Sequence, residues 1–438
     1  MTQRLSRIPQ FARLALMTAA AVAGPYSSAQ ATTLYSFTGG SDGNQPRSGV
    51  IQINGSFYGT TFYGGTSSCS DGGIPGCGVV FKLSPAAGGS WHETVLHNFT
   101  FASGDGAYPE GLLTSDANNN LYGTAGGGIN SCNFYGCGVV FELKPASGGS
   151  YTETILYSFQ GASDGYAPRT GVIFGTDGGL YGTTTLAGEP GTGCGTVFRL
   201  GPPSVGGGPW SFSVLYTFTN SSDGCYPQGL VFGANGALYG TTQNTVFELA
   251  PPAMAGQSWR FTTLHTFSGS TDGYSPGGGV VYGVGGALYG STSDGGTLSG
   301  GTVFQVAPPI TGGTTWTETV LYNFPFTTGP IGNLALGANG LLVGTTLGGG
   351  VACDKLNHPD RCGMVFSLRP PTVVGANWTY GLIHNFTATG GDGGQPEAGV
   401  FLSTKGQIYG TTTVGGTGTA TCSSGFVPGC GTVFMFNP

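Results

Sequence analysis

Residues 105–159 read DGAYPEGLLTSDANNNLYGTAGGGINSCNFYGCGVVFELKPASGGSYTETILYSF. Four segments of this stretch are rich in β-branched and aromatic residues, and turns rich in Gly, Asn and Asp separate them, which is typical of short β-strands. The segments are residues 111–114, 121–125, 139–143 and 152–159, and we call them strands a, b, c and d. Apolar residues do not recur with the helical spacing, so the stretch predicts strands rather than helices.

The same pattern occurs seven times along the chain. The segment that contains its c strand, a Val-Phe motif, begins at Gly78, Gly138, Gly195, Asn244, Gly301, Gly363 and Gly431. Seven repeats of four strands predict an all-β fold, a seven-bladed β-propeller of four-stranded blades. The alternative is an open β-solenoid, which would need distinct capping repeats, and the sequence shows none.

The two ends of the chain complement each other. The last repeat has strands at residues 399–402, 407–412 and 431–436 but lacks a d strand, whereas residues 33–37 (TLYSF) form a d strand with no a, b or c strand before it. We therefore expect the N-terminal strand to complete the last blade and to close the ring. Residues 32–438 would then form a single domain.

The composition excludes several classes of protein. Gly and Pro contribute 86 and 26 of the 438 residues, but 39% of the chain is hydrophobic and 12% is aromatic, which excludes a disordered chain. Only 8% of residues are charged, the formal net charge is −7, and Lys and Arg do not cluster, so we expect no nucleic-acid partner. Beyond the N-terminus no apolar run is long enough for a transmembrane segment. We expect a monomer.

Residues 1–31 have the features of a secretory signal peptide. Three Arg residues give a positively charged start, residues 14–24 form a short apolar core, and Ala29-Gln30-Ala31 fits a cleavage site. The sequence therefore predicts a protein that is secreted, periplasmic or attached to the cell surface after cleavage near Ala31.

All ten Cys residues follow this segment, and an even number of Cys in an exported protein indicates disulfides rather than metal ligands. In a propeller blade the b–c loops and the d–a connections emerge on the same face, so a Cys in one can reach a Cys in the other. The predicted disulfides are Cys69–Cys77, Cys132–Cys137, Cys194–Cys225, Cys353–Cys362 and Cys422–Cys430.

The repeated unit LYGTT…GTVFxLxP…LYxF…DGxxP resembles the GloVer repeat, a tandem repeat of the Gloeobacter/Verrucomicrobia type that occurs in secreted and surface proteins of environmental bacteria. The resemblance covers nearly all of residues 32–438. It implies an exported, propeller-like protein. It implies no reaction and no catalytic residues.

The most regular polar residue is the Asp of the DG pair in the d–a connections. We call the face of the ring that carries these turns the DG face, and we expect the carboxylates near the mouth of the central channel. Such a ring could bind cations, calcium included, or sugar hydroxyls; the alternative is a turn role, with Asp accepting a backbone hydrogen bond and Gly supplying a positive φ. The candidates are Asp42, Asp105, Asp164, Asp223, Asp272 and Asp392.

The sixth repeat departs from the pattern. Its b–c loop, residues 353–362, concentrates four charges and a His in a chain with few charges. Asp354, His358, Asp360 and Arg361 are candidates for contact with a ligand or partner; the alternative is a solvated, variable loop.

Two further positions of strand d carry ionisable residues. His97, His265 and His384 occupy a position that is Tyr in other repeats, which indicates a packing role. A nearby position holds Glu in three repeats, and we expect these carboxylates to be solvated. They are Glu93, Glu153 and Glu318.

No catalytic motif or constellation appears, and no cofactor is expected. The leading hypothesis is a secreted, non-catalytic binding or surface propeller that recognises an extracellular glycan or protein through its DG face. The alternatives are an extracellular lyase or hydrolase that acts on polysaccharide, and a structural cell-surface protein.

Overall fold

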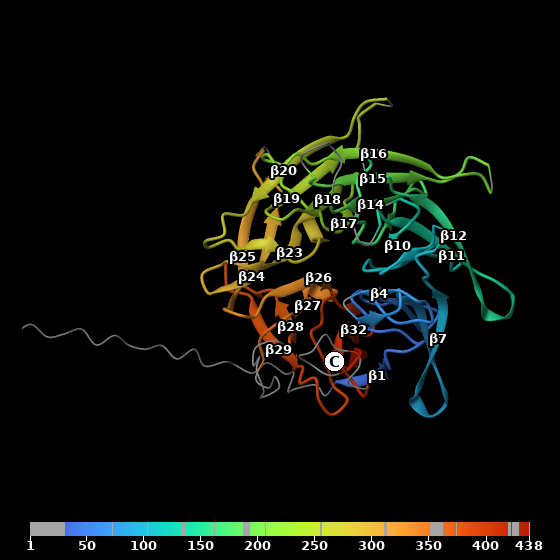
Figure 1. The fold of residues 1–438 in the computed structure, drawn as a ribbon. Helices are drawn as coiled ribbons and strands as arrows, with labels where there is room; N and C mark the ends of the chain where they lie inside the picture. Colours follow the sequence, from blue (N-terminus) through green and yellow to red (C-terminus); the bar gives the residue numbers. More distant parts are fainter. Residues whose placement is uncertain are drawn as a thin grey trace, which may run out of the picture.

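The computed structural model describes residues 31–437, except residues 72, 103, 131, 133–135, 162, 187–192, 206, 255, 311–312, 351–361, 374, 419–421 and 423–428. Seven antiparallel sheets stand around a central axis and form a β-propeller (Figure 1). The expected all-β, seven-bladed fold is confirmed. Among the described residues no helix is long and apolar enough to span a bilayer.

Each blade runs from an inner strand a to an outer strand d, in chain order except in the last blade, whose strand d comes from the N-terminal end of the chain. The first four blades consist of β2 (Ile51–Ile53), β3 (Ser56–Thr61), β6 (Val79–Pro85) and β7 (Trp91–Asn98); β9 (Thr114–Ser115), β10 (Leu121–Gly127), β11 (Val139–Pro145) and β12 (Tyr151–Ser158); β13 (Ile173–Phe174), β14 (Leu180–Thr184), β15 (Thr196–Gly201) and β16 (Ser211–Thr217); and β17 (Leu230–Phe232), β18 (Leu238–Thr241), β19 (Thr245–Ala250) and β20 (Arg260–Thr266).

The other three blades follow the same plan. They consist of β22 (Val281–Tyr282), β23 (Leu288–Asp294), β24 (Ser299–Ala307) and β25 (Thr317–Pro325); β26 (Pro330–Leu336), β27 (Leu342–Thr346), β28 (Met364–Arg369) and β29 (Thr379–Asn385); and β31 (Phe401–Leu402), β32 (Ile408–Thr412), β34 (Thr432–Phe436) and β1 (Thr32–Ser36). Shorter elements lie in the connections: β4 (Ser70–Asp71), β5 (Ile74–Pro75), β8 (Gly106–Ala107), β21 (Tyr274–Pro276), β30 (Gly393–Gly394), β33 (Val414–Gly415) and the 3₁₀ turns Ala87–Gly89, Ser147–Gly149, Val284–Gly286 and Ala338–Gly340.

Pairs of Phe rings join neighbouring blades. The Phe that follows strand d of one blade packs edge-on against the Phe of strand c in the next, as for Phe159 and Phe198, whose ring centroids are 5.2 Å apart. The Phe of strand c also explains the invariant Gly of the LYGTT motif, because a Cβ on Gly182 would lie only 2.6 Å from Cζ of Phe198. The repeated sequence thus encodes the contact that holds one blade to the next.

The Trp residues that open strand d have a packing role. Trp210, for example, packs against Tyr122 of the preceding blade with 6.3 Å between ring centroids. This contact joins the outer strand of one blade to the preceding blade.

The N-terminal strand closes the ring as expected. β1 pairs antiparallel with β34, with Thr33 opposite Phe434 and Tyr35 opposite Val433, and so completes the last blade (Figure 1). Phe37, which follows β1, is fully buried and packs against Phe81 of the first blade at 5.1 Å. The two ends of the chain therefore share one blade.

Four of the five expected disulfides are present: Cys69–Cys77, Cys132–Cys137, Cys194–Cys225 and Cys422–Cys430. Cys194–Cys225 links the b–c loop of the third blade to the connection that enters the fourth. The fifth expected pair includes Cys353, which lies outside the described residues.

Candidate functional site at the channel mouth

The inner strands and the turns that precede them surround a central cavity of about 460 Å³. Most of its wall is Gly and apolar residues, for example residues 49–51, 111–113 and 277–279. Four charged side chains also line it: Arg47, Glu110, Arg169 and Glu397. In a chain with so few charges, their presence at one cavity singles out this part of the molecule.

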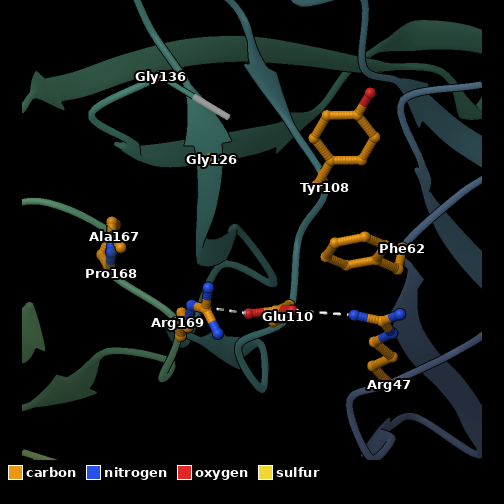
Figure 2. A pocket seen from close by; sticks show the side chains of 9 residues that line it. All are labelled: Arg47, Phe62, Tyr108, Glu110, Gly126, Gly136, Ala167, Pro168 and Arg169. Atoms are coloured by element: carbon orange, nitrogen blue, oxygen red, sulfur yellow. Dashed lines mark hydrogen bonds and ion pairs between the residues drawn. The ribbon is translucent and has the colours of Figure 1, made fainter. Parts of the chain in front are cut away.

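The four charges form a continuous chain across four consecutive blades. Arg47 Nη1 lies 3.2 Å from Glu110 Oε1, and Arg47 Nε lies 3.6 Å from Glu397 Oε2. Arg169 Nε lies 3.5 Å from the second carboxylate oxygen of Glu110. Figure 2 shows Glu110 between the two guanidinium groups.

All four residues occupy the same place in the repeat, directly after the Pro of the DGxxP turn. The ring of this Pro packs closely against the Gly that precedes strand c of the previous blade. At Gly138, where φ is +101°, a Cβ would clash with Pro168. The turn therefore has a defined position, and it directs the next side chain, here Arg169, towards the channel.

Neighbouring groups hold Arg47 in place. Its guanidinium lies over the ring of Phe62, 3.9 Å from the centroid, and Nη2 donates a hydrogen bond to Gln45 Oε1 at 3.2 Å. Burial raises the pKa of Glu397, and the repulsion of Glu110 adds to this, while the charge of Arg47 opposes it. Arg47 thus joins the two carboxylates and is ordered before any ligand arrives.

A smaller cavity of about 110 Å³ opens between Arg47 and Arg169 (Figure 2). Phe62 and Tyr108 form its apolar wall, and Glu110 lies at its edge between the two Arg side chains. A ligand here would meet hydrogen-bond donors, a carboxylate acceptor and an apolar surface together. These residues were not among the predicted site residues, although a charge after Pro in four of the seven turns is visible in the sequence.

The six DG carboxylates do not lie at this mouth, so that expectation is corrected. None of these six described residues lines the central cavity. Each accepts a hydrogen bond from a backbone N–H at the end of strand d, as Asp42 does from Thr38 at 2.8 Å, and each contacts the Tyr or His of strand d, as Asp42 does with Tyr35 at 3.0 Å. The same backbone bond is made by Asp105, Asp164, Asp223, Asp272 and Asp392. These bonds are the ones that the turn role predicts. Binding of a ligand by the six carboxylates stays a prediction.

The candidate loop of the sixth repeat lies outside the described residues. This applies to Asp354, His358, Asp360 and Arg361. Their role in binding stays a prediction.

The expectation that Glu93, Glu153 and Glu318 are solvated is wrong. One carboxylate oxygen of each is buried and has no hydrogen-bond partner. Burial raises the pKa of Glu93 and of Glu318 to about 7, and the nearby Asp42 and Asp272 carboxylates add to the increase. These carboxyl groups lie between strand d of one blade and strand d of the previous one.

The raised pKa values predict how stability depends on pH. Folding takes up protons between the unfolded pKa of about 4.3 and the folded value, so stability falls as pH rises across that window. Partial exposure limits the effect to about 1 kcal/mol per residue. A Glu93→Gln/Glu318→Gln variant should match the wild type near pH 4 and be more stable near pH 8 by about 2 kcal/mol, measured by urea unfolding. Parallel pH profiles for the two proteins would contradict this.

Solved structures with a similar arrangement are distant in sequence. The extracellular domain of a putative one-component system from B. thetaiotaomicron is 12% identical with a TM-score of 0.53, over 94% of this chain and 40% of that chain. Virginiamycin B lyase from Staphylococcus aureus is 12% identical with a TM-score of 0.51, over 93% and 99%. PorZ, a surface component of the type-IX secretion system of Porphyromonas gingivalis, is 11% identical with a TM-score of 0.50, over 90% and 46%. At these identities the similarity concerns the fold alone.

The match to a sequence family is more specific than these structural similarities. No curated protein sequence matches the chain. The model of the Gloeobacter/Verrucomicrobia repeat matches residues 23–198, 67–251 and 188–423, which together span most of the seven blades. The chain therefore belongs to the Gloeobacter/Verrucomicrobia repeat family.

Proposed function

We propose that the protein is an exported binding propeller whose channel mouth recognises a hydroxyl-rich extracellular glycan. The observation that carries this is the chain of charges from Glu397 to Arg169. When all four groups are ionised their charges cancel, so the mouth favours a neutral, polar ligand over a strongly anionic one. Alternating donors and acceptors suit sugar hydroxyls, and the wall formed by Phe62 and Tyr108 suits the apolar face of a sugar ring.

Export is part of this proposal. The disulfides of the described residues are typical of an oxidising compartment, outside the cytoplasm. Cleavage near Ala31 would leave Thr32, the first residue of β1, at the new N-terminus. N-terminal sequencing of the exported protein checks this step.

The test is a titration of the oxidised protein that begins at Thr32 with a panel of neutral and acidic oligosaccharides, monitored by thermal shift and calorimetry. A ligand that binds the native state raises the melting temperature by mass action. We expect a saturable shift with at least one neutral glycan. Glu110→Gln should weaken that binding tenfold or more, about 1.4 kcal/mol, because the link between the two Arg side chains is lost.

A matched control is available elsewhere on the ring. Asp177 pairs with Arg199, whose Nε donates to it at 2.9 Å, and Asp177→Asn removes a similar ion pair away from the channel. This variant should bind the glycan like the wild type. If no glycan of the panel shifts the melting temperature, the result would favour a structural role. If both variants bind the glycan with equal affinity, the binding site must lie elsewhere. Cleaved glycan products would show that the protein is an enzyme.

A further inference from the structure

A second group of ionisable side chains lies at the outer edge of the ring, between the first two blades. His97 belongs to β7, Asp105 follows in the turn that enters the second blade, and Glu153 belongs to β12. All three side chains are largely buried but reach solvent, with 18%, 14% and 16% of their surfaces exposed. The channel-mouth site does not include them.

The three side chains converge. Nε2 of His97 lies 3.3 Å from Asp105 Oδ1 and 3.5 Å from Glu153 Oε1, and one ligand atom from each residue lies within 4.8 Å of the other two. Within the part of the chain that the structure describes, this is the one group of three His, Cys, Asp or Glu residues that meets this limit.

The surrounding bonds leave the converging atoms available. Asp105 Oδ2 is occupied by hydrogen bonds from the backbone N–H and the hydroxyl of Thr100, at 2.8 and 2.7 Å, which orient Oδ1 towards His97. Such outer bonds typically orient metal ligands. Glu153 Oε1 is buried and has no hydrogen-bond partner when the carboxyl is ionised. Burial and the nearby Asp105 carboxyl, to which a protonated Glu153 can hydrogen-bond, raise the pKa of Glu153 to about 7, so a metal must also displace a proton from Glu153 below that pH.

Other blade interfaces show that the repeat does not need this arrangement. Between the second and third blades the same two positions hold Tyr157 and Phe212, which stack with 4.0 Å between centroids. Between the fourth and fifth, His265 lies 3.3 Å from Asp272, but Glu318 does not complete a similarly close group. Packing alone therefore does not require three ionisable groups at the first interface.

We propose that His97, Asp105 and Glu153 form a site for a divalent transition-metal ion of the Zn²⁺ class. One imidazole nitrogen and two carboxylate oxygens are ligands that Zn²⁺ accepts, with metal–ligand distances of about 2.0–2.2 Å. In a tetrahedral site such distances place ligand atoms about 3.4 Å apart, close to the two separations from His97 Nε2. The ion would relieve the repulsion between Asp105 and Glu153 and link the two blades. Ca²⁺, which takes six or more oxygen ligands, fits less well.

A proton on His97 is the competing explanation. Burial lowers the pKa of His97, but the hydrogen bond to Asp105 and the charges of Glu153 and Asp105 outweigh it, so the pKa is raised. A protonated imidazole would satisfy both carboxylates without a metal. Metal must displace this proton, so binding should strengthen as pH rises.

The test is calorimetric titration of Zn²⁺, and absorption spectroscopy with Co²⁺, on the oxidised chain after metal removal. His97→Tyr is the decisive variant because Tyr35, Tyr157 and Tyr216 stand at this position in other blades, so the fold accepts it. We expect one strong equivalent in the wild type and at least about 100-fold weaker binding in His97→Tyr.

His265→Tyr is the matched control, since His265 has the same place in its blade and an Asp partner. The His265→Tyr variant should still bind one equivalent of Zn²⁺ as tightly as the wild type. Comparable melting temperatures of the variants in the presence of a chelator would show that both are folded. No strong equivalent in the wild type, or one that survives His97→Tyr, would overturn the proposal in favour of the proton alone or of a site elsewhere.

Discussion

A chain that begins at Thr38 instead of Thr32 is expected to lose most of its stability. The deletion removes β1, and with it all backbone hydrogen bonds between β34 and β1. It also removes the fully buried ring of Phe37. Removing a buried Phe side chain alone costs about 3–5 kcal/mol. The total should exceed about 5 kcal/mol, which is comparable to the stability of a whole domain. The thermal unfolding temperature measures the loss.

A peptide supplies the control for this deletion. A synthetic peptide of residues 31–38 should bind the open edge of β34 and restore part of the melting temperature, because it offers the missing strand. A scrambled peptide should not. An unchanged melting temperature in the truncated chain would show that the ring does not depend on its closing strand.

Loss of Cys194–Cys225 should destabilise the protein more than loss of Cys132–Cys137. The first bridge spans 31 residues and the second spans 5, and a longer closed loop restricts the unfolded chain more. By chain entropy the costs are about 3.5 and about 2 kcal/mol. Urea unfolding of Cys194→Ala/Cys225→Ala and Cys132→Ala/Cys137→Ala compares them, and Ala adds no polar group at these sites, of which Cys137, Cys194 and Cys225 are buried. Equal losses, or the reverse order, would refute the entropic explanation.

The repeats predicted most of the fold because each strand and turn is encoded locally and seven times over. Blade order, ring closure and the described disulfides all followed from aligning one repeat with another. The predicted bounds of the inner strands were less accurate. Residues 111–114 were expected to pair, whereas the structure has β9 at Thr114–Ser115. Gly111 instead faces the next blade, where a Cβ would lie 2.7 Å from the backbone N of Gly171, so this segment lines the channel.

The channel-mouth site could not be predicted from any single repeat, because its residues come from four different repeats. A charged residue after Pro in an isolated turn resembles any solvated turn residue. Only ring closure brings Glu397 beside Arg47, which lies near the other end of the sequence. The sequence instead suggested the Asp residues of the DG pairs as a binding site. Because the same Asp occurs in six repeats, its regularity is explained by its hydrogen bonds within the turn. The burial of Glu93, Glu153 and Glu318 was not predicted, because the groups that surround these side chains include residues of the neighbouring blade.

Arginine-specific chemical modification, followed by peptide mapping, tests the binding claim most directly. Arg169 is 55% exposed at the mouth and should react readily in the free protein. Arg199 beside Asp177 serves as the internal reference. The proposed function predicts that a bound glycan protects Arg169 and leaves Arg199 unchanged. Saturating glycan that binds without protecting Arg169 would contradict recognition at the channel mouth.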